Sequence, residues 1–109
     1  MTVLVKRHPD LSVEEFHDRW RAHGRIIADE PSFRTMIRRY EQHHRNAADY
    51  RNGDTFDGVA VQEFDDYQGF LAFLAAPAYA AKVQPDEQTL IDIDAVVVLF
   101  SDEPEVYIG

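Results

Sequence analysis

Residues 12–30 constrain the fold of this chain most, because they form the pattern of one amphipathic helix with a marked start. Ser12 and Glu15 have the spacing of a capping box, in which each side chain satisfies a free backbone amide of the first turn. Large side chains then recur every three or four residues, which places them on one helix face. They are Val13, Phe16, Trp20, His23 and Ile27. We therefore predict a helix that stops before Pro31 and turns the His23 imidazole toward the core or a cleft.

Composition indicates one folded domain over residues 1–109. The chain is 45% hydrophobic and 12% aromatic, which is typical of a globular protein rather than a disordered segment. It has no cysteine, so thiolate chemistry and disulfides are excluded. No apolar run approaches the roughly 20 residues of a membrane helix. The first residues lack the basic and apolar regions of a signal peptide, so we expect a cytoplasmic protein.

Charge is divided unevenly along the chain. The net charge is −9, and residues 1–52 carry +2 whereas residues 53–109 carry −11. An acidic chain is a poor candidate for nucleic acid or an anionic membrane, so we predict neither as a partner. The asymmetry fits either two differently solvated surfaces or charge complementarity between subunits.

Hydrophobic patterns divide the chain into alternating elements. We predict strands at residues 2–8, 33–44, 59–64 and 92–100, a loop at 45–57 and an extended tail after 100. A second helix begins after Asp65 or Asp66. Its expected apolar stripe consists of Tyr67, Phe70, Leu71 and Leu74. Pro77 then opens a further turn and Pro85 breaks it, with a short turn at 86–91.

The order strand, helix, strand, strand, helix, strand predicts an α+β fold of the ferredoxin-like, split βαβ type. In this fold two helices cover one face of a four-stranded antiparallel sheet. The other face would expose apolar side chains, either Val96, Val98 and Phe100 or their alternates. A large exposed apolar patch normally marks an association site. We therefore predict a homodimer in which two sheets pack face to face and enclose a cavity.

Several motifs together resemble the EthD family. The matching residues at the start of the chain are Lys6, Arg7, Pro9, Leu11, Ser12, Glu14, Glu15, Phe16, Trp20, His23, Gly24, Arg39, Tyr40 and His44. Further resemblances are Phe56-Asp57-Gly58-Val59-Ala60, Pro77-Ala78-Tyr79, and Asp86-Glu87 followed by Ile91-Asp92. The resemblance implies a dimeric α+β barrel and small, cofactor-poor proteins. Relatives include proteins tied to ether degradation and the dehydratases, decarboxylases and anthrone oxygenases of aromatic polyketide pathways.

The third predicted strand departs from the family pattern, which commonly runs Val-Ala-Glu-hydrophobic-Trp-Phe. Here Val61 stands at the position of the usual acid, Gln62 at that of the hydrophobic residue and Glu63 at that of the tryptophan. Because side chains alternate along a strand, Glu63 shares a face with the usual acid. The sequence alone does not decide whether Glu63 replaces that acid.

The candidate catalytic residues are His23, Glu63 and His44. An imidazole titrates near neutrality and can shuttle a proton, although His23 could equally be a buried histidine that serves packing. Glu63 would orient His23 or act as a base, and otherwise it is an exposed strand residue. His43 and His44 point to opposite faces of a strand, so they form no metal pair, and we expect no metal and no cofactor.

The candidate substrate-binding residues are Tyr40, Trp20, Arg39 and Lys6. Tyr40 and Trp20 would stack on an aromatic ligand, although the position of Trp20 on the helix stripe favours core packing. Arg39 and Lys6 would bind an anionic group, unless they are simply solvated.

Two functions follow from these residues. The first is a cofactor-independent enzyme, a lyase, cyclase or monooxygenase of secondary metabolism or aromatic degradation, with His23 as general acid and base. The second is a non-catalytic binding or accessory protein whose dimer cleft holds a small hydrophobic ligand. A dimer that only supports a neighbouring pathway protein is a third possibility.

Overall fold

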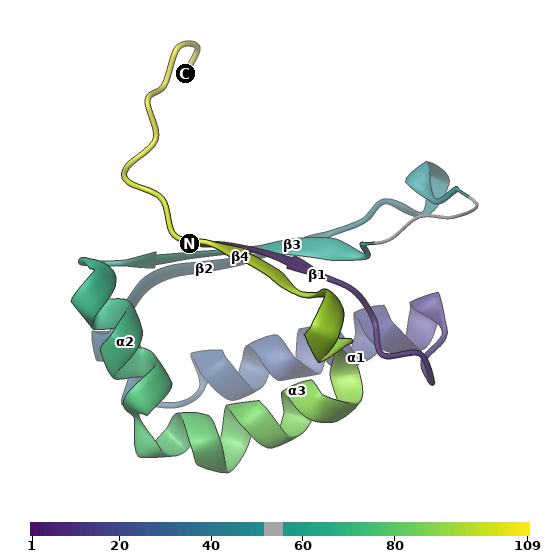
Figure 1. Ribbon diagram of the computed structural model, residues 1–109, viewed down its shortest axis with the longest axis horizontal. Helices are drawn as coiled ribbons and strands as arrows, with labels where there is room; N and C mark the ends of the chain where they lie inside the picture. The colour runs from purple at the N-terminus through teal and green to yellow at the C-terminus, as the bar shows by residue number, and fades with distance from the viewer. Residues whose placement is uncertain (52–55) are drawn as a thin grey trace.

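A computed structural model describes residues 1–51 and 56–109, so part of the loop predicted at 45–57 lies outside the described residues. The main elements are β1 (Thr2–Val5), α1 (Val13–Ala28), β2 (Ile37–His44), β3 (Gly58–Phe64), α2 (Tyr67–Ala75), α3 (Gln84–Leu90) and β4 (Val97–Leu99). The strands form one antiparallel sheet in the order β2-β3-β1-β4. All three helices lie on one face of it (Figure 1). The predicted ferredoxin-like α+β fold is confirmed, with α3 as an addition to the predicted elements.

Helix α1 forms as its sequence predicts. The Ser12 hydroxyl accepts a hydrogen bond from the Glu15 amide at 3.1 Å, and the Glu15 carboxylate accepts one from the Ser12 amide at 3.0 Å. Phe16, Trp20 and Ile27 are buried on the face that meets the sheet, and His23 is buried with them. The capping box and the stripe therefore determine both where α1 begins and how it is rotated.

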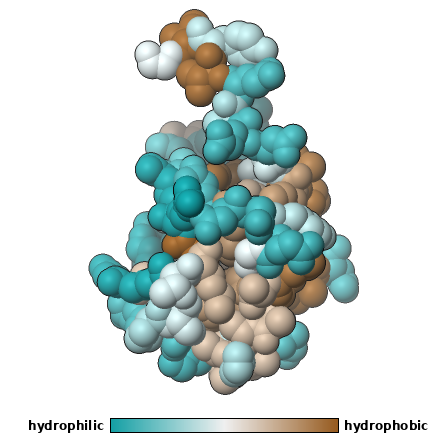
Figure 2. Space-filling view, turned by 90° about the vertical axis from the view of Figure 1, so that its left-hand side faces the viewer, coloured by the Kyte–Doolittle hydropathy of each residue, from teal (hydrophilic) through white to brown (hydrophobic). Residues whose placement is uncertain are grey.

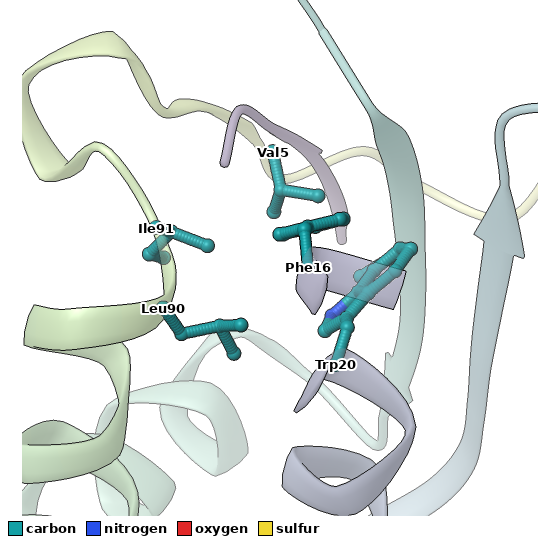
Figure 3. Close-up of a cluster of buried hydrophobic side chains, with 6 residues drawn as sticks. Val5, Phe16, Trp20, Leu90 and Ile91 are labelled. Carbon is teal, nitrogen blue, oxygen red and sulfur yellow. The ribbon is translucent and has the colours of Figure 1, made fainter. Parts of the chain in front are cut away.

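The core consists of two clusters between the helices and the sheet. One joins β1, α1 and the end of α3 through Val5, Phe16, Trp20, Ala60, Leu90 and Ile91 (Figure 3). The other joins α1 and α2 through Ile27, Phe33, Phe73, Ala76 and Val83. Phe73, which the predicted stripe leaves out, is the buried residue of α2. Of the stripe, Phe70 is half-buried, whereas Tyr67, Leu71 and Leu74 are exposed. That part of the prediction was wrong because α2 is apolar nearly all round, so its spacing could not select a buried face.

Several predicted boundaries also differ from the structure. The first strand ends at Val5, not at residue 8. Residues 33–35 form a 3₁₀ turn, and β2 begins only at Ile37, with a bulge before Arg39. Residues 92–96 include a 3₁₀ turn at Ile93–Ala95, so the last strand is short. Pro85 does not break its helix, because the π-helical turn Tyr79–Val83 leads directly into α3 and places the proline in the first turn of α3.

The two faces of the sheet carry different side chains. Val3, Val5, Ala60 and Gln62 face the helices, where they line an internal cavity. On the opposite face, cross-strand neighbours bring together Leu4, Val59, Val61, Val97 and Leu99. Val97 and Leu99 are 48% and 64% exposed there. The alternates of the predicted Val96 and Val98 therefore form the exposed apolar face.

The remaining surface is mixed. Figure 2 shows apolar and hydrophilic surface side by side at the end of the molecule that carries α2, with the tail after β4 standing clear of the body. In that tail Val106, Tyr107 and Ile108 are 69% or more exposed. Among the described helices, none combines the length and the apolar character needed to cross a membrane.

Gly58 allows the closest approach between α1 and the sheet. A Cβ atom at Gly58 would lie 2.4 Å from the Trp20 ring and 2.7 Å from the backbone oxygen of His43. We therefore expect Gly58→Ala to lower the free energy of unfolding by about 1–3 kcal/mol, as overpacking of a core does. Urea unfolding measures this change.

Gly69→Ala is the matched control, because a Cβ atom there would meet its nearest neighbour at an ordinary 3.6 Å. Gly69 lies in α2, where alanine stabilises a helix by up to about 1 kcal/mol over glycine. Equal effects of the two substitutions would contradict the close contact at Gly58.

Candidate functional site

The candidate site is a cavity of about 160 Å³ between the helices and the sheet. Its walls are mostly apolar, and its polar groups are His23, Tyr40, Gln62, Tyr79 and Glu87. Apolar cavities with a few convergent polar groups are the usual form of small-molecule sites. A larger hollow of about 440 Å³ lies beside α1 and β2 and is lined by five arginines. We favour the smaller cavity because the titratable groups of α1 and α3 meet there.

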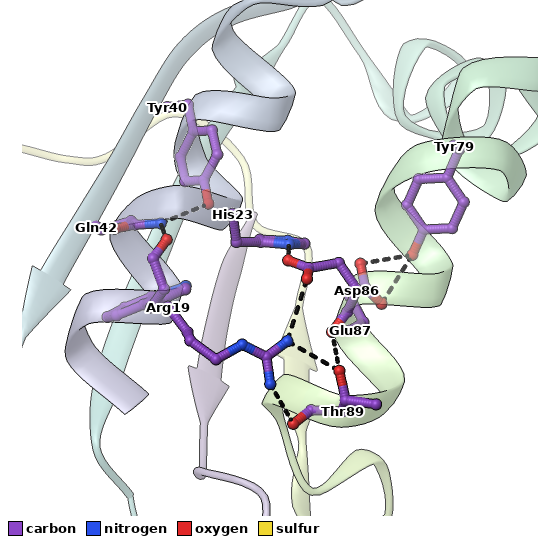
Figure 4. Close-up of polar contacts among 9 residues, drawn as sticks. Arg19, His23, Tyr40, Gln42, Tyr79, Asp86, Glu87 and Thr89 are labelled. Atoms are coloured by element: carbon purple, nitrogen blue, oxygen red, sulfur yellow. Dashed lines mark hydrogen bonds and ion pairs between the residues drawn. The ribbon is translucent and has the colours of Figure 1, made fainter. Parts of the chain in front are cut away.

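His23 is held in place by Asp86 from α3. Its Nδ1 lies 2.8 Å from Asp86 Oδ2, and only 6% of the residue is exposed (Figure 4). A carboxylate accepts from Nδ1–H, so the neutral ring carries its lone pair on Nε2. Within the described residues no hydrogen bond occupies that second nitrogen. His23 is therefore an oriented imidazole with one nitrogen available on a ring that lines the cavity.

Arg19 fixes the carboxylate that holds His23. Arg19 and His23 lie four residues apart on α1, so they project from neighbouring turns of one face. The Arg19 guanidinium donates to Asp86 Oδ1 at 3.1 Å and to the backbone oxygen and hydroxyl of Thr89 at 2.8 Å each (Figure 4). These bonds tie the middle of α1 to α3 and set the distance between the imidazole and its carboxylate.

A second carboxyl group, Glu87, lines the cavity beside this pair. The Tyr79 hydroxyl donates to Glu87 Oε1 at 3.1 Å. Burial raises the pKa of Glu87, and the neighbouring Asp86 raises it further, although Tyr79 and His23 act in the opposite direction. Burial, with Glu87 nearby, also raises the pKa of the Tyr79 hydroxyl. Asp86 and Glu87 are thus adjacent in sequence but differ in role, one orienting His23 and the other lining the cavity.

The structure brings only some of the predicted site residues together. His23, Trp20 and Tyr40 line the cavity. Glu63 does not, because β3 turns Gln62 toward the helices and Glu63 toward the opposite face, where it lies across from Arg39. Arg39 is exposed and pairs with Glu41 at 2.6 Å, and Lys6 is not among the cavity-lining residues.

His44 belongs to a separate polar network. Its Nδ1 lies 2.7 Å from Nδ1 of His17, and its Nε2 lies 3.0 Å from Oε1 of Gln42. His17 continues to the Tyr50 hydroxyl, which donates to Asp57 at 2.7 Å. Gln42 connects this network to the cavity, because its amide donates to the Tyr40 hydroxyl at 3.1 Å. A direct role of His44 in the cavity therefore finds no support in its position.

Sequence reasoning missed four residues of the site. Three of them, Gln62, Tyr79 and Glu87, line the cavity, and the fourth, Asp86, is the partner of His23. Tyr79, Asp86 and Glu87 do lie in segments that resemble family motifs, but no pattern in the sequence connects them to His23. Gln62 was recognisable as a polar residue in an apolar strand.

The partly buried His17 and His44 make stability depend on pH. Desolvation lowers the pKa of His44 to about 4, with Arg21 and His17 contributing, and desolvation also lowers the pKa of His17. Between the ordinary histidine pKa of about 6.5 and a pH of about 4, the unfolded chain binds protons that the folded chain does not. Their contribution to stability is complete above pH 6.5 and declines as the pH falls toward 4.

We expect His44→Gln to lose less stability than the wild type between pH 7 and pH 4, measured as urea midpoints at each pH. His43→Gln, on the exposed face of the same strand, is the control and should follow the wild-type curve. Parallel curves for His44→Gln and the wild type would contradict the lowered pKa of His44 in the folded protein.

Comparisons with known proteins agree with this architecture. Residues 8–94 match the EthD domain family. No curated protein matches the chain. A solved dimeric protein of unknown function and ferredoxin-like fold from Bacteroides fragilis is similar, with a TM-score of 0.61 and 21% sequence identity over 84% of each chain. At that identity the likeness concerns the fold alone. Because the family match spans most of the chain, this protein belongs to the EthD family.

Proposed function

We propose that this protein is a cofactor-independent enzyme that moves a proton on a small, neutral aromatic or polyketide-like compound. The observation that carries the proposal is the buried His23, which lines a mostly apolar cavity and whose imidazole is held by Asp86 at 2.8 Å. Lyase, cyclase and oxygenase reactions of such compounds can all begin by removing a proton from a carbon next to a carbonyl group.

In the first step, Nε2 of His23 takes that proton, and the electron pair of the broken C–H bond moves to the carbonyl oxygen, which yields an enolate. The imidazolium that forms is stabilised by Asp86 at 2.8 Å. His23 then returns the proton. In a dehydration it goes to a departing hydroxyl group, which leaves as water; in a cyclisation it goes to the oxygen of the carbonyl that the enolate attacks. An oxygenase would in addition consume dioxygen.

The supporting roles differ from those predicted for Glu63 and His44. Asp86 takes the orienting role, because it contacts the imidazole directly. Glu87 is a candidate second proton carrier, because it lines the cavity and burial raises its pKa.

Proton exchange tests the proposal without knowledge of the natural substrate. We expect wild-type protein to accelerate exchange of the α protons of 2-indanone in D₂O, followed by proton NMR. His23→Gln should lower this rate about 10²-fold or more, the usual contribution of a positioned general base. Asp86→Asn should lower it less, because the imidazole stays in place but loses its fixed tautomer.

Asp18→Asn, on the exposed side of α1, is the control and should exchange at the wild-type rate. If His23→Gln binds 2-indanone and exchanges it as fast as the wild type does, the enzymatic proposal fails. The alternative, a binding or accessory protein, then stands. Its supporting observation is that Asp86 also bonds Arg19, so the His23–Asp86 contact can serve to hold α1 against α3.

We further propose that two copies pair through the exposed face of the sheet. The similar Bacteroides fragilis protein is dimeric, and this chain exposes Val97 and Leu99 beside Leu4 and Val59 on the face that the helices leave uncovered. Burying such a face removes apolar surface from water. Each subunit would keep its own cavity, because the cavity lies on the helix side of the sheet.

We expect Leu4→Glu to shift the protein from dimer to monomer at micromolar concentration, measured by sedimentation velocity. Leu4 lies between Val59 and Val97 in the sheet, so a carboxylate there would be buried without a partner in the dimer. Glu14→Lys on α1 is the control and should remain dimeric. If Leu4→Glu dimerises with the affinity of the wild type, the exposed face of the sheet is not the dimer interface.

A further inference from the structure

Gln62 carries a buried polar atom that no part of the described chain satisfies. The residue lies on β3, is 7% exposed and lines the cavity. Its side-chain oxygen Oε1 is buried and has no hydrogen-bond partner among the described residues. A buried acceptor without a partner destabilises a fold, and buried polar groups in native structures normally have partners. An amide without a hydrogen-bond partner on a cavity wall therefore indicates a group that a bound ligand would satisfy.

Tyr40 stands directly beside Gln62. The two residues are opposite each other on β2 and β3, so their side chains lie next to each other on the cavity face of the sheet. The Tyr40 hydroxyl accepts a hydrogen bond from Gln42 at 3.1 Å, which leaves its own proton to be donated. Burial raises the pKa of Tyr40, with a contribution from Glu87, so the hydroxyl keeps that proton at neutral pH.

The cavity favours a neutral ligand. No lysine or arginine side chain is among the residues that line it, whereas Glu87 is, and the α-ammonium of Met1 at its wall already donates to the backbone oxygen of Gln62 at 2.8 Å. An anionic ligand would thus enter a largely apolar space without a basic side chain to pair with it, which is unfavourable. The polar groups available on the sheet side are one hydroxyl donor and one amide, which offers both an acceptor and a donor whichever way it is turned.

We propose that Tyr40 and Gln62 form a recognition pair for a neutral ligand that carries a carbonyl oxygen beside a hydroxyl or N–H group. Tyr40 donates to the carbonyl oxygen, and Gln62 accepts from the neighbouring hydroxyl or N–H. The proposal rests on the proposed function, since it names the ligand class of the same cavity. It places the carbonyl oxygen on the sheet side, against a hydroxyl donor that can stabilise negative charge as the enolate forms.

Binding of small probes tests the pair. Benzamide has a carbonyl oxygen beside an N–H₂ group, acetophenone has the carbonyl oxygen alone, and benzoate is the charged isostere. Titrations followed by NMR should show that wild-type protein binds benzamide about tenfold or more tightly than acetophenone, and benzoate most weakly. A tenfold preference is the size expected when one neutral hydrogen bond is lost and its buried partner is left unpaired.

Gln62→Met keeps the length of the side chain and removes its polar atoms. It should abolish the preference for benzamide over acetophenone and raise the melting temperature of the ligand-free protein by several degrees, because the unsatisfied oxygen is gone. Tyr40→Phe should instead weaken benzamide and acetophenone alike. Gln68→Met, at an exposed position of α2, is the matched control and should leave the preference intact.

Equal affinities of the wild type for benzamide and acetophenone, or a preference that survives in Gln62→Met, would overturn the recognition pair. So would a failure of all three probes to bind at millimolar concentration. His23→Gln separates this proposal from the catalytic one, because it should keep the benzamide preference even if it exchanges no protons. If the wild type accelerates proton exchange in 2-indanone but binds benzamide no more tightly than acetophenone, the proposed function stands and only the recognition pair is overturned.

Discussion

The structure depends on how the Trp20 side chain packs against the sheet. Its ring lies so close to Gly58 that any side chain there would overlap it, and its centroid is 4.5 Å from that of His44. Its backbone oxygen accepts a hydrogen bond from the Gln42 side chain at 2.7 Å. A Cβ atom at Gly24 would meet the same Gln42 amide at 2.8 Å. One large side chain and two glycines therefore set the distance between α1 and the sheet, and thereby the position of His23 one turn further along.

The cavity adjoins this close packing, since Val5, Trp20 and Leu90 of the buried cluster also line it. Near Trp20 the helix touches the sheet, and the cluster of Val5, Phe16 and Leu90 fills the space (Figure 3). Further along, α2 and α3 complete the walls of the cavity that His23 lines. The cavity is thus a consequence of how three helices share one face of a small sheet. Its polar groups come from α1, the sheet, the π-helical turn before α3, and α3 itself.

Two polar systems flank Trp20 and differ in kind. On the α3 side, Arg19, Asp86 and His23 form a compact ion-pair network in which both carboxylate oxygens are used. On the β2 side, His17 and His44 form a chain of largely neutral hydrogen bonds that burial keeps from taking up protons readily. The first orients the His23 imidazole, and the second supports Gln42 and, through it, Tyr40. The two systems thus position the polar groups of the cavity independently, one from α3 and the other from β2.

The sequence by itself determined α1, the order of the elements, and the presence of His23 on a buried face. Those features are local: a capping box, a 3.6-residue spacing and turn residues act over a few positions. Tertiary structure alone decided which face of β3 meets the helices. Both faces of β3 carry apolar residues, Val59 and Val61 on one and Ala60 on the other. Alternation along the strand therefore predicts that Gln62 and Glu63 lie on opposite faces, but it does not predict which of the two is buried.

The partner of His23 was also decided by the tertiary structure. Asp86 lies 63 residues further along the chain. It follows a π-helical turn and Pro85, at which the sequence predicted a break in the helix. Contacts between residues so far apart in the sequence depend on how whole elements pack, and no short-range sequence pattern predicts them.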